Sequence, residues 1–326
     1  MNRIKLFILT GMVSSALIYS GCKTPALTQS PTIQTLPTSF TVAGSDTTQN
    51  SGMQPWHSFF KDPYLVQLID TALLHNQELA IAWQEIAIAK NDIRLRNGNL
   101  FPKVEAGAGI GIEKVGRYTS QGAGDASTDI TPDREVPEWL PDYRLGVVAS
   151  WEADIWKKLR NSKQAAVKRY LSSVEGRNFI ITNLIAELAN GYYELLALDN
   201  QLRIVKQSIV LQQQALNIVR IQKQAAAATE LAVKKFEAEV LNAQTMEYDI
   251  QQKIKVKEYE LNYLSGRFPQ PIARDTNALL NLQPESLSVG LPAALLQNRP
   301  DIHQAELEVA AAKLDVKVAR AEFFPS

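Results

Sequence analysis

The feature that most constrains this chain is a long stretch without proline, which lies between Pro141 and Pro269. Within it, over residues 158–224, apolar side chains recur at gaps of three, four and seven residues, which is the spacing of a helix and close to a heptad repeat. Because an α-helix rises about 1.5 Å per residue, the pattern predicts a rod of roughly 100 Å. A second apolar stripe on the same segment indicates packing neighbours on two sides, as in a bundle or the wall of a cylinder.

A second helix is predicted after a short interruption. Thr229 can cap its N-terminus, and apolar residues again follow heptad spacing up to residue 265. Gly266 then ends the helix, with two prolines just beyond it. The sequence therefore predicts a helical hairpin whose arms, 158–224 and 229–265, differ in length.

Two other segments alternate with a period of two, which is the pattern of β-strands. They are residues 101–114 and 143–154, and residues 115–142 between them are predicted to form a polar loop. Each segment is long enough for a transmembrane strand, which needs about 9–11 residues with apolar side chains on one face. A soluble hairpin is the alternative that alternation alone leaves open. The candidates for an aromatic belt at a membrane interface are Trp139, Trp151 and Trp156.

The N-terminus has the pattern of an export signal. Over residues 1–21, two basic residues precede an apolar stretch that is too short to span a bilayer. Small residues then precede Cys22, the only cysteine, and this ending resembles the lipobox of bacterial lipoproteins. Cys22 is therefore the predicted lipid anchor, and a cleaved signal with a chance cysteine is the alternative. Residues 22–55, rich in Thr, Ser, Pro and Gln, predict an extended linker.

The composition argues against most enzymes and against nucleic-acid binding. With 34 basic and 34 acidic residues, the chain lacks the excess positive charge with which proteins neutralise phosphates. One cysteine and three scattered histidines, His57, His75 and His303, offer no metal-ligand spacing and little for imidazole catalysis. We therefore predict no catalytic residue, no metal or cofactor site and no nucleic-acid partner.

Part of the chain is duplicated. Residues 79–102 align with 302–325, and both copies end in Phe-Pro. The copies lie too far apart for a solenoid repeat, so the pattern indicates two halves of similar build. The first half is predicted to cover residues 56–266, with helices over 62–98 before its strands. Residues 267–326 would then form a linker and the opening of a second half, truncated before its strands.

Three motifs resemble those of one known family. They open the first half, form the end of its second strand with the exit into the long helix, and open the second half. They are Trp56 with Asp62-Pro63 and Ala82; Trp151-Glu152-Ala153-Asp154-Ile155-Trp156; and Arg299-Pro300-Asp301-Ile302 with Glu306. These residues make the chain similar to TolC-like outer-membrane efflux channels, and Cys22 makes it similar to their lipoprotein branch, the NodT family.

By this resemblance the fold is mainly α with a β-hairpin. Long antiparallel helices would cross the periplasm, and the strands would join a β-barrel shared by a homotrimer in the outer membrane. The protein would be a lipid-anchored, passive channel of a tripartite efflux system, and not an enzyme. Its partners would be outer-membrane lipid, a periplasmic adaptor protein and an inner-membrane pump of the RND type. The sequence does not name the exported drug, metal or other small molecule.

The resemblance also assigns adaptor contact to the turn between the two long helices. The predicted contact residues are Gln224, Thr229, Glu230 and Leu231. The chain departs from the family at two positions where glycine is usual, and there it carries Lys157 and Ala226. It also has Ala232 where an aspartate is frequent. The geometry of the tip is therefore left open.

The alternative function is that of a periplasmic adaptor lipoprotein of an efflux or secretion system. Such a protein also combines a lipidated terminus with a long helical hairpin, but it has a β-domain rich in Gly and Val and no duplicated helix–strand block. A soluble nutrient-binding lipoprotein is a third class, and it would show shorter helices and an aromatic-rich pocket. The duplication and the long helices favour the channel.

Overall fold

The computed structural model describes residues 54–276 and 296–325. The predicted signal peptide, the predicted anchor Cys22 and most of the predicted linker lie outside the described residues. The chain divides into two compact units. Among the described residues, the strand unit comprises 91–166 and 312–325, and the helical unit comprises 54–90, 167–276 and 296–311.

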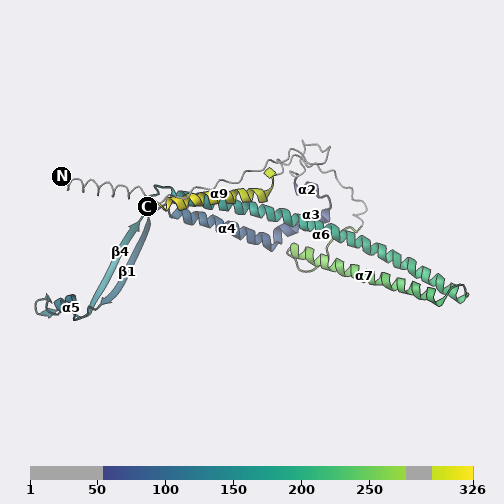
Figure 1. The fold of residues 1–326 in the computed structure, drawn as a ribbon, viewed down its shortest axis with the longest axis horizontal. Coiled ribbons are helices and arrows are strands. Elements are labelled where there is room, and N and C mark those ends of the chain that lie inside the picture. Colours follow the sequence, from purple (N-terminus) through teal and green to yellow (C-terminus); the bar gives the residue numbers. More distant parts are fainter. Residues whose placement is uncertain (1–53, 277–295, 326) are drawn as a thin grey trace, which may run out of the picture. The chain divides into compact units, whose positions relative to one another are not determined.

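Most of the described chain is helical, which confirms the mainly α fold. The helices are α2 (Trp56–Phe59), α3 (Pro63–His75), α4 (Gln77–Gly98), α5 (Ser120–Asp125), α6 (Lys158–Gln224), α7 (Glu230–Leu264) and α9 (Pro300–Ala321) (Figure 1). The long helix α6 has 67 residues and the bounds that its apolar spacing predicts, and α7 has 35 residues. No helix in the described part of the chain is both long and apolar enough to cross a lipid bilayer.

The helical region predicted over 62–98 is divided at Asn76, which joins three elements. Its side-chain oxygen accepts a hydrogen bond from the amide of Leu79 at 3.0 Å and so caps α4. Its side-chain nitrogen donates to the carbonyl of Leu264, the last residue of α7, at 2.9 Å. The side chain is 7% exposed. One buried residue therefore ends α3, begins α4 and fastens both to the end of α7.

The main core of the helical unit lies where α3 and α7 pack against α6. Its fully buried residues are Leu65, Ile69, Leu188, Tyr192, Leu195, Leu196 and Leu261. The hydroxyl of Tyr192 donates to Asp62 at 2.8 Å, and Asp62 also caps α3. Burial and this bond to Asp62 raise the pKa of Tyr192 above its ordinary value. The first apolar stripe of α6 thus supplies core residues such as Leu188, Tyr192 and Leu195. Of the second stripe Leu196 is buried, whereas Ile204, Leu211 and Ile218 are more than half exposed.

The C-terminus of α7 depends on Gly266, which follows its cap residue Ser265. The amide of Gly266 donates to the carbonyl of Tyr263, and the next amide, of Arg267, donates to Asn262 at 2.9 Å. These two bonds form a Schellman motif, in which the residue directly after the cap, here Gly266, takes a left-handed conformation. Gly266 has φ +64°, and a Cβ there would lie 2.2 Å from the carbonyl oxygen of His75. Only glycine fits this position.

A buried ion-pair cluster holds the segment that follows α7. Arg274 binds the carboxylate of Asp199 through two nitrogens, at 2.5 and 3.1 Å, and that of Glu258 at 2.8 Å. The three side chains are 12%, 10% and 6% exposed. Burial alone would raise the pKa of Glu258, but hydrogen bonds from Lys255 and Arg274 outweigh it and hold this pKa below its usual value. Arg274 therefore links the segment to both α6 and α7.

The strand unit contains two long antiparallel strands, β1 (Lys103–Glu113) and β4 (Leu140–Ser150). The alternation predicted strands over 101–114 and 143–154, so the second prediction is wrong at both ends. β4 begins earlier because it pairs with β1 along its whole length, from Leu140 opposite Glu113 to Ser150 opposite Lys103. It ends at Ser150 because the following residues form the turn into α6.

The loop predicted over 115–142 is more ordered than its composition indicates. It contains α5 and a small hairpin of β2 (Asp129–Thr131) and β3 (Arg134–Glu135). The hydroxyl of Thr119 caps α5 by accepting a bond from the amide of Gly122 at 3.1 Å. A Cβ at Gly122 would lie 2.2 Å from the carbonyl oxygen of Gly116, so glycine is required there too.

Candidate functional site

The strand pair has one entirely apolar face. In an antiparallel pair, residues opposite each other point to the same side, and successive residues alternate between sides. The pairs on this face are Val104–Ala149, Ala106–Val147, Ala108–Leu145, Ile110–Tyr143 and Ile112–Pro141. Their larger side chains are exposed, with Leu145 90% and Ile110 82% exposed. The register therefore joins the two predicted apolar sets into one surface.

The opposite face of the strand pair is mostly small and polar, with Val148 and Leu140 as its apolar exceptions. Its pairs are Lys103–Ser150, Glu105–Val148, Gly107–Gly146, Gly109–Arg144, Gly111–Asp142 and Glu113–Leu140. Arg144 bonds to Asp142 at 2.6 Å on this face. Each strand has 11 residues, which is the length needed to span a bilayer as a tilted strand. A sheet with these two faces can separate hydrocarbon from an aqueous lumen.

The motif from Trp151 to Trp156 forms the turn between β4 and α6. The carboxylate of Asp154 accepts bonds from the amides of Leu159 at 2.9 Å and Arg160 at 3.0 Å, so it caps the first turn of α6. Glu152 forms an ion pair with Lys158 at 2.5 Å. Two of the predicted motif residues, Asp154 and Glu152, thus fix the start of the long helix.

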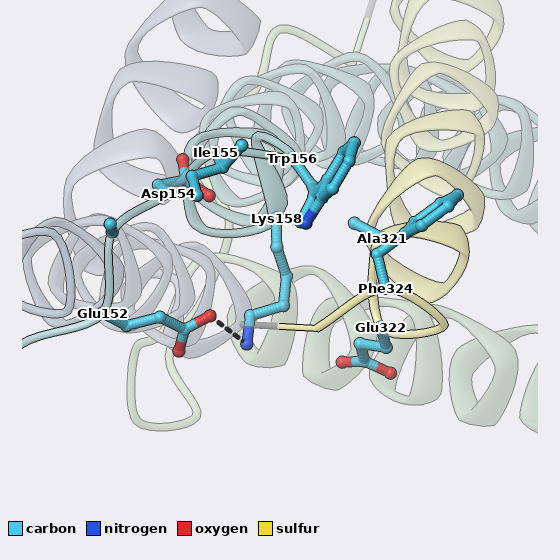
Figure 2. Close-up of a pocket in the computed structure, with 9 residues that line it drawn as sticks. Glu152, Asp154, Ile155, Trp156, Lys158, Ala321, Glu322 and Phe324 are labelled. Carbon is cyan, nitrogen blue, oxygen red and sulfur yellow. Dashed lines mark ion pairs between the residues drawn. The ribbon is translucent and has the colours of Figure 1, made fainter.

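The two tryptophans of this turn bind the backbone at two different places. The indole nitrogen of Trp151 donates to the carbonyl of Leu100, just before β1, at 3.1 Å. The indole nitrogen of Trp156 donates to the carbonyl of Pro325 at 2.9 Å, and its ring stacks on Phe324 with centroids 4.7 Å apart. Figure 2 shows this stack beside a small pocket into which Glu152 and Lys158 also project. The turn therefore contacts the ends of both duplicated segments, 79–102 and 302–325.

Lys157, at the position where the family resemblance predicts glycine, adopts a left-handed conformation with φ 60°. For a residue with a Cβ this conformation costs about 1–2 kcal/mol. Lys157 therefore occupies a position where a glycine would adopt the same backbone conformation without strain. The side chain is exposed.

The α6–α7 turn brings together the predicted tip residues Gln224, Thr229, Glu230 and Leu231. The hydroxyl of Thr229 accepts a bond from the amide of Ala232 at 3.2 Å and caps α7, as the sequence predicts. Glu230 forms an ion pair with Lys223 across the turn. Leu231 is 79% exposed, so the tip presents a large apolar side chain. This surface could receive a partner helix by apolar packing.

Ion pairs hold the two arms of the hairpin together near this tip. Glu237 binds Arg220 at 2.8 Å and Lys234 at 2.9 Å. Hydrogen bonds from Arg220 and Lys234 lower the pKa of Glu237 to about 2. The bond from Lys223 likewise lowers the pKa of Glu230. Both carboxylates therefore stay charged at any physiological pH. Near this end of the hairpin, Leu216, Val233 and Val240 form a small second core.

Replacing Ala226 with glycine is expected to stabilise the tip. Ala226 ends α6 in a Schellman motif with φ 57°, the same role that Gly266 has at the end of α7. Relief of the left-handed strain, less the entropy lost by a glycine, should raise the free energy of unfolding by about 0.5–1 kcal/mol. Denaturant unfolding measures this gain. Ala227→Gly is the control, and this variant should be less stable than the wild type. Equal effects of the two substitutions would show that the backbone at Ala226 is not strained.

The motif at the start of α9 forms a local pair. Arg299 binds Asp301 through two bonds, at 3.0 and 2.5 Å, and Asp301 lies in the first turn of the helix that Pro300 begins. An acidic residue in the first turn favours a helix N-terminus. Glu306 is exposed on the same helix. These residues start a helix and form no reactive cluster.

Two groups of contacts were not predicted from the sequence. The Arg274 cluster joins residues with no shared motif or spacing, so no local signal indicates it. The contact of Trp156 with Phe324 had a partial signal, because the duplication singled out Phe324. Within the described residues, no group of three or more His, Cys, Asp or Glu side chains could hold a metal ion.

Comparisons with known proteins agree with this architecture. The toluene efflux pump outer membrane protein TtgC of Pseudomonas putida is 30% identical over 276 residues, which are 84% of this chain and 54% of that protein. The pyoverdine export outer membrane protein OpmQ of Pseudomonas aeruginosa is 28% identical over 315 residues, 96% of this chain and 65% of that protein. This chain therefore spans between about half and two thirds of the lengths of these relatives.

Solved structures show the same fold. The CusC channel superposes with a TM-score of 0.72 and 23% identity, over 90% of this chain and 64% of that one. The CmeC outer membrane channel of Campylobacter jejuni gives a TM-score of 0.74 and 19% identity, over 92% and 62%. Residues 68–267 match the family model described as outer membrane efflux protein. Because this match covers more than half of the chain, the chain belongs to the outer membrane efflux protein family.

Proposed function

We propose that the chain is a subunit of an outer-membrane channel, a passive conduit for the export of small molecules. The observation that carries this proposal is the register of β1 and β4, which collects ten apolar residues on one face and mostly small and polar residues on the other. Family membership supports it and gives no support to a periplasmic adaptor. The apolar face would contact lipid, and the other face would line the lumen.

Two strands alone cannot form a pore in a membrane. Their outer edges would leave backbone amides and carbonyls unpaired in hydrocarbon, where each such group costs several kcal/mol. Pairing with strands from other copies removes these edges. We therefore propose a homotrimer with a shared β-barrel, in which α6 and α7 form part of a wall that extends into the periplasm.

The α6–α7 tip is the proposed contact for a periplasmic adaptor, through Gln224, Thr229, Glu230 and Leu231. Its support is geometric: the turn is capped and cross-linked by ion pairs, and it exposes alanines and Leu231. The adaptor would connect the channel to an inner-membrane pump of the RND type. Cys22 remains the proposed lipid anchor, and the outer membrane remains the proposed location.

The proposed substrates are drugs, metals or other small molecules. Relatives are named for toluene efflux, antibiotic efflux and pyoverdine export, so their names cover more than one kind of small molecule. The polar face of the strand pair carries both signs of charge, Lys103 and Arg144 against Glu105, Asp142 and Glu113. Such a lining selects weakly by charge, which suits a conduit that serves a pump.

The expected loss of function on Leu145→Arg tests the proposal. Leu145 lies at the middle of β4 on the apolar face, where an arginine in contact with lipid should cost about 2–4 kcal/mol per subunit. A strain lacking the gene should become sensitive to some of a panel of dyes, detergents, antibiotics and metal ions. The wild-type gene should restore resistance, and the Leu145→Arg variant should not.

The neighbouring substitution Gly146→Arg is the matched control. Gly146 lies on the polar face, and no atom lies within 4 Å of a Cβ built there, so the new arginine would enter the lumen. This variant should insert into the outer membrane and restore resistance at least in part. Equal behaviour of the two variants would overturn the assignment of faces. The proposed function would be overturned if the deletion strain kept its normal resistance and the protein of the wild-type strain were absent from outer-membrane fractions.

A further inference from the structure

Lys157 is the one long side chain among the described non-glycine residues with positive φ. The others are Asp133 and Ala226, whose side chains are short. Aspartate visits the left-handed region more readily than most residues, and alanine places only a methyl group there. A lysine gains nothing from this conformation that glycine would not provide. Backbone strain of this kind is often kept where the side chain has a function.

Exposed apolar side chains precede Lys157 in the chain, and Phe324 stacks on the adjacent Trp156. This aromatic collar consists of Trp151, Ile155, Trp156 and Phe324, which are 62%, 71%, 47% and 47% exposed. Both indole nitrogens already donate to backbone carbonyls, those of Leu100 and Pro325. The polar ends of the tryptophans are therefore satisfied within the protein, while much of each residue's surface remains exposed.

The charges of the turn leave Lys157 without an ion-pair partner in the described part of the chain. Glu152 is paired with Lys158 at 2.5 Å, and Figure 2 marks this ion pair with a dashed line. Asp154 caps α6 and contacts Arg160 at 3.5 Å. Over residues 151–163 there are four basic side chains and two acidic ones, so the segment has a net positive charge. An anion is the complementary ligand.

The position of the collar indicates which anion. Trp151 directly follows Ser150, the last residue of β4, so the collar lies at the helix-side end of the apolar strand face. If that face contacts lipid, this end meets the polar headgroups. Tryptophan side chains favour that depth, and basic residues there attract anionic lipids. We propose that Lys157 and the aromatic collar bind the headgroup of an anionic glycerophospholipid in the periplasm-facing leaflet of the outer membrane. This inference rests on the proposed function.

Lipid retention by variants of Lys157 tests the inference. The protein is purified from outer membranes in mild detergent, placed in nanodiscs of phosphatidylcholine with a minority of phosphatidylglycerol, and the bound lipids are counted by native mass spectrometry. The wild type should retain phosphatidylglycerol, and Lys157→Gly should retain roughly fivefold less, the loss expected for one basic residue near an anionic surface. Lys157→Arg should behave as the wild type. Inorganic phosphate should not displace the lipid.

The stability of the same variants separates binding from structure. Lys157→Gly relieves backbone strain, so its thermal midpoint should be equal to or above that of the wild type while its lipid retention falls. Equal retention of phosphatidylglycerol by Lys157→Gly and the wild type would overturn the inference. This is the result expected if a second copy of the chain, and not lipid, covered the collar. Absence of the wild-type protein from outer-membrane fractions would instead overturn the proposed function.

Discussion

Replacing Gly266 with alanine should lower the free energy of unfolding by about 2–5 kcal/mol. The left-handed conformation at φ +64° costs a residue with a Cβ about 1–2 kcal/mol. The new methyl group would also lie 2.2 Å from the carbonyl oxygen of His75, and relieving such overpacking typically costs about 1–3 kcal/mol more. The backbone at His75 cannot move away easily, because Asn76 is bonded to both α4 and α7.

Thermal and denaturant unfolding of the purified protein would measure this loss. Gly98→Ala is the matched control, since Gly98 ends α4, has no positive φ and has no atom within 4 Å of a built Cβ. Alanine there should be neutral or stabilising by up to about 1 kcal/mol, because it favours the helix. Equal effects of the two substitutions would show that Gly266 is not the constrained position that its contacts indicate.

The sequence predicts the elements of this fold better than their ends. Apolar spacing over 158–224 places α6 at Lys158–Gln224, because a long helix repeats the same signal many times. Alternation likewise predicts the five apolar-face residues of β1 and four of the five of β4, and the register brings them onto one face. The predicted end of the second strand at residue 154 is wrong, because Asp154 is used to cap α6. Alternation carries no information about such a competing side-chain bond.

Contacts between distant segments were the harder part of the candidate sites. Family motifs indicate that Trp151, Glu152 and Asp154 belong together. Glu152 and Asp154 act through short-range pairing and capping, whereas Trp151 bonds to the distant Leu100. The stack of Trp156 on Phe324 joins residues far apart in the chain and has no periodic signal. Lys157 and Ala226 are instructive, since each replaces a glycine of the family and each has a positive φ. The substitutions did not remove the backbone turn, because the flanking helices and caps fix it.

Replacing Arg274 with leucine should cost about 3–5 kcal/mol of stability. The change leaves Asp199, which is 10% exposed, without the cation that the structure places beside it, and leaves Glu258, which is 6% exposed, paired with Lys255 alone. An unpaired buried charge is expensive, whereas removing all the charges together costs far less. The triple variant Arg274→Leu, Asp199→Asn, Glu258→Gln should therefore recover much of the loss. Arg274→Lys should fall between, because a lysine cannot bind a carboxylate through two parallel bonds.

Unfolding measured across pH gives this prediction a second readout. The pKa of Glu258 is lower in the folded protein than its ordinary value of 4.5. Its pairing therefore stabilises the fold fully at pH values above 4.5, and this stabilisation is lost as the pH falls through the lowered pKa. Arg274→Leu removes one of the two bonds that lower it, so the variant should lose less stability on acidification than the wild type does. Arg203→Leu, at an exposed arginine of α6, is the control and should change neither stability nor its pH dependence appreciably. If Arg274→Leu behaves as Arg203→Leu does, the cluster does not hold the segment after α7 against the two long helices.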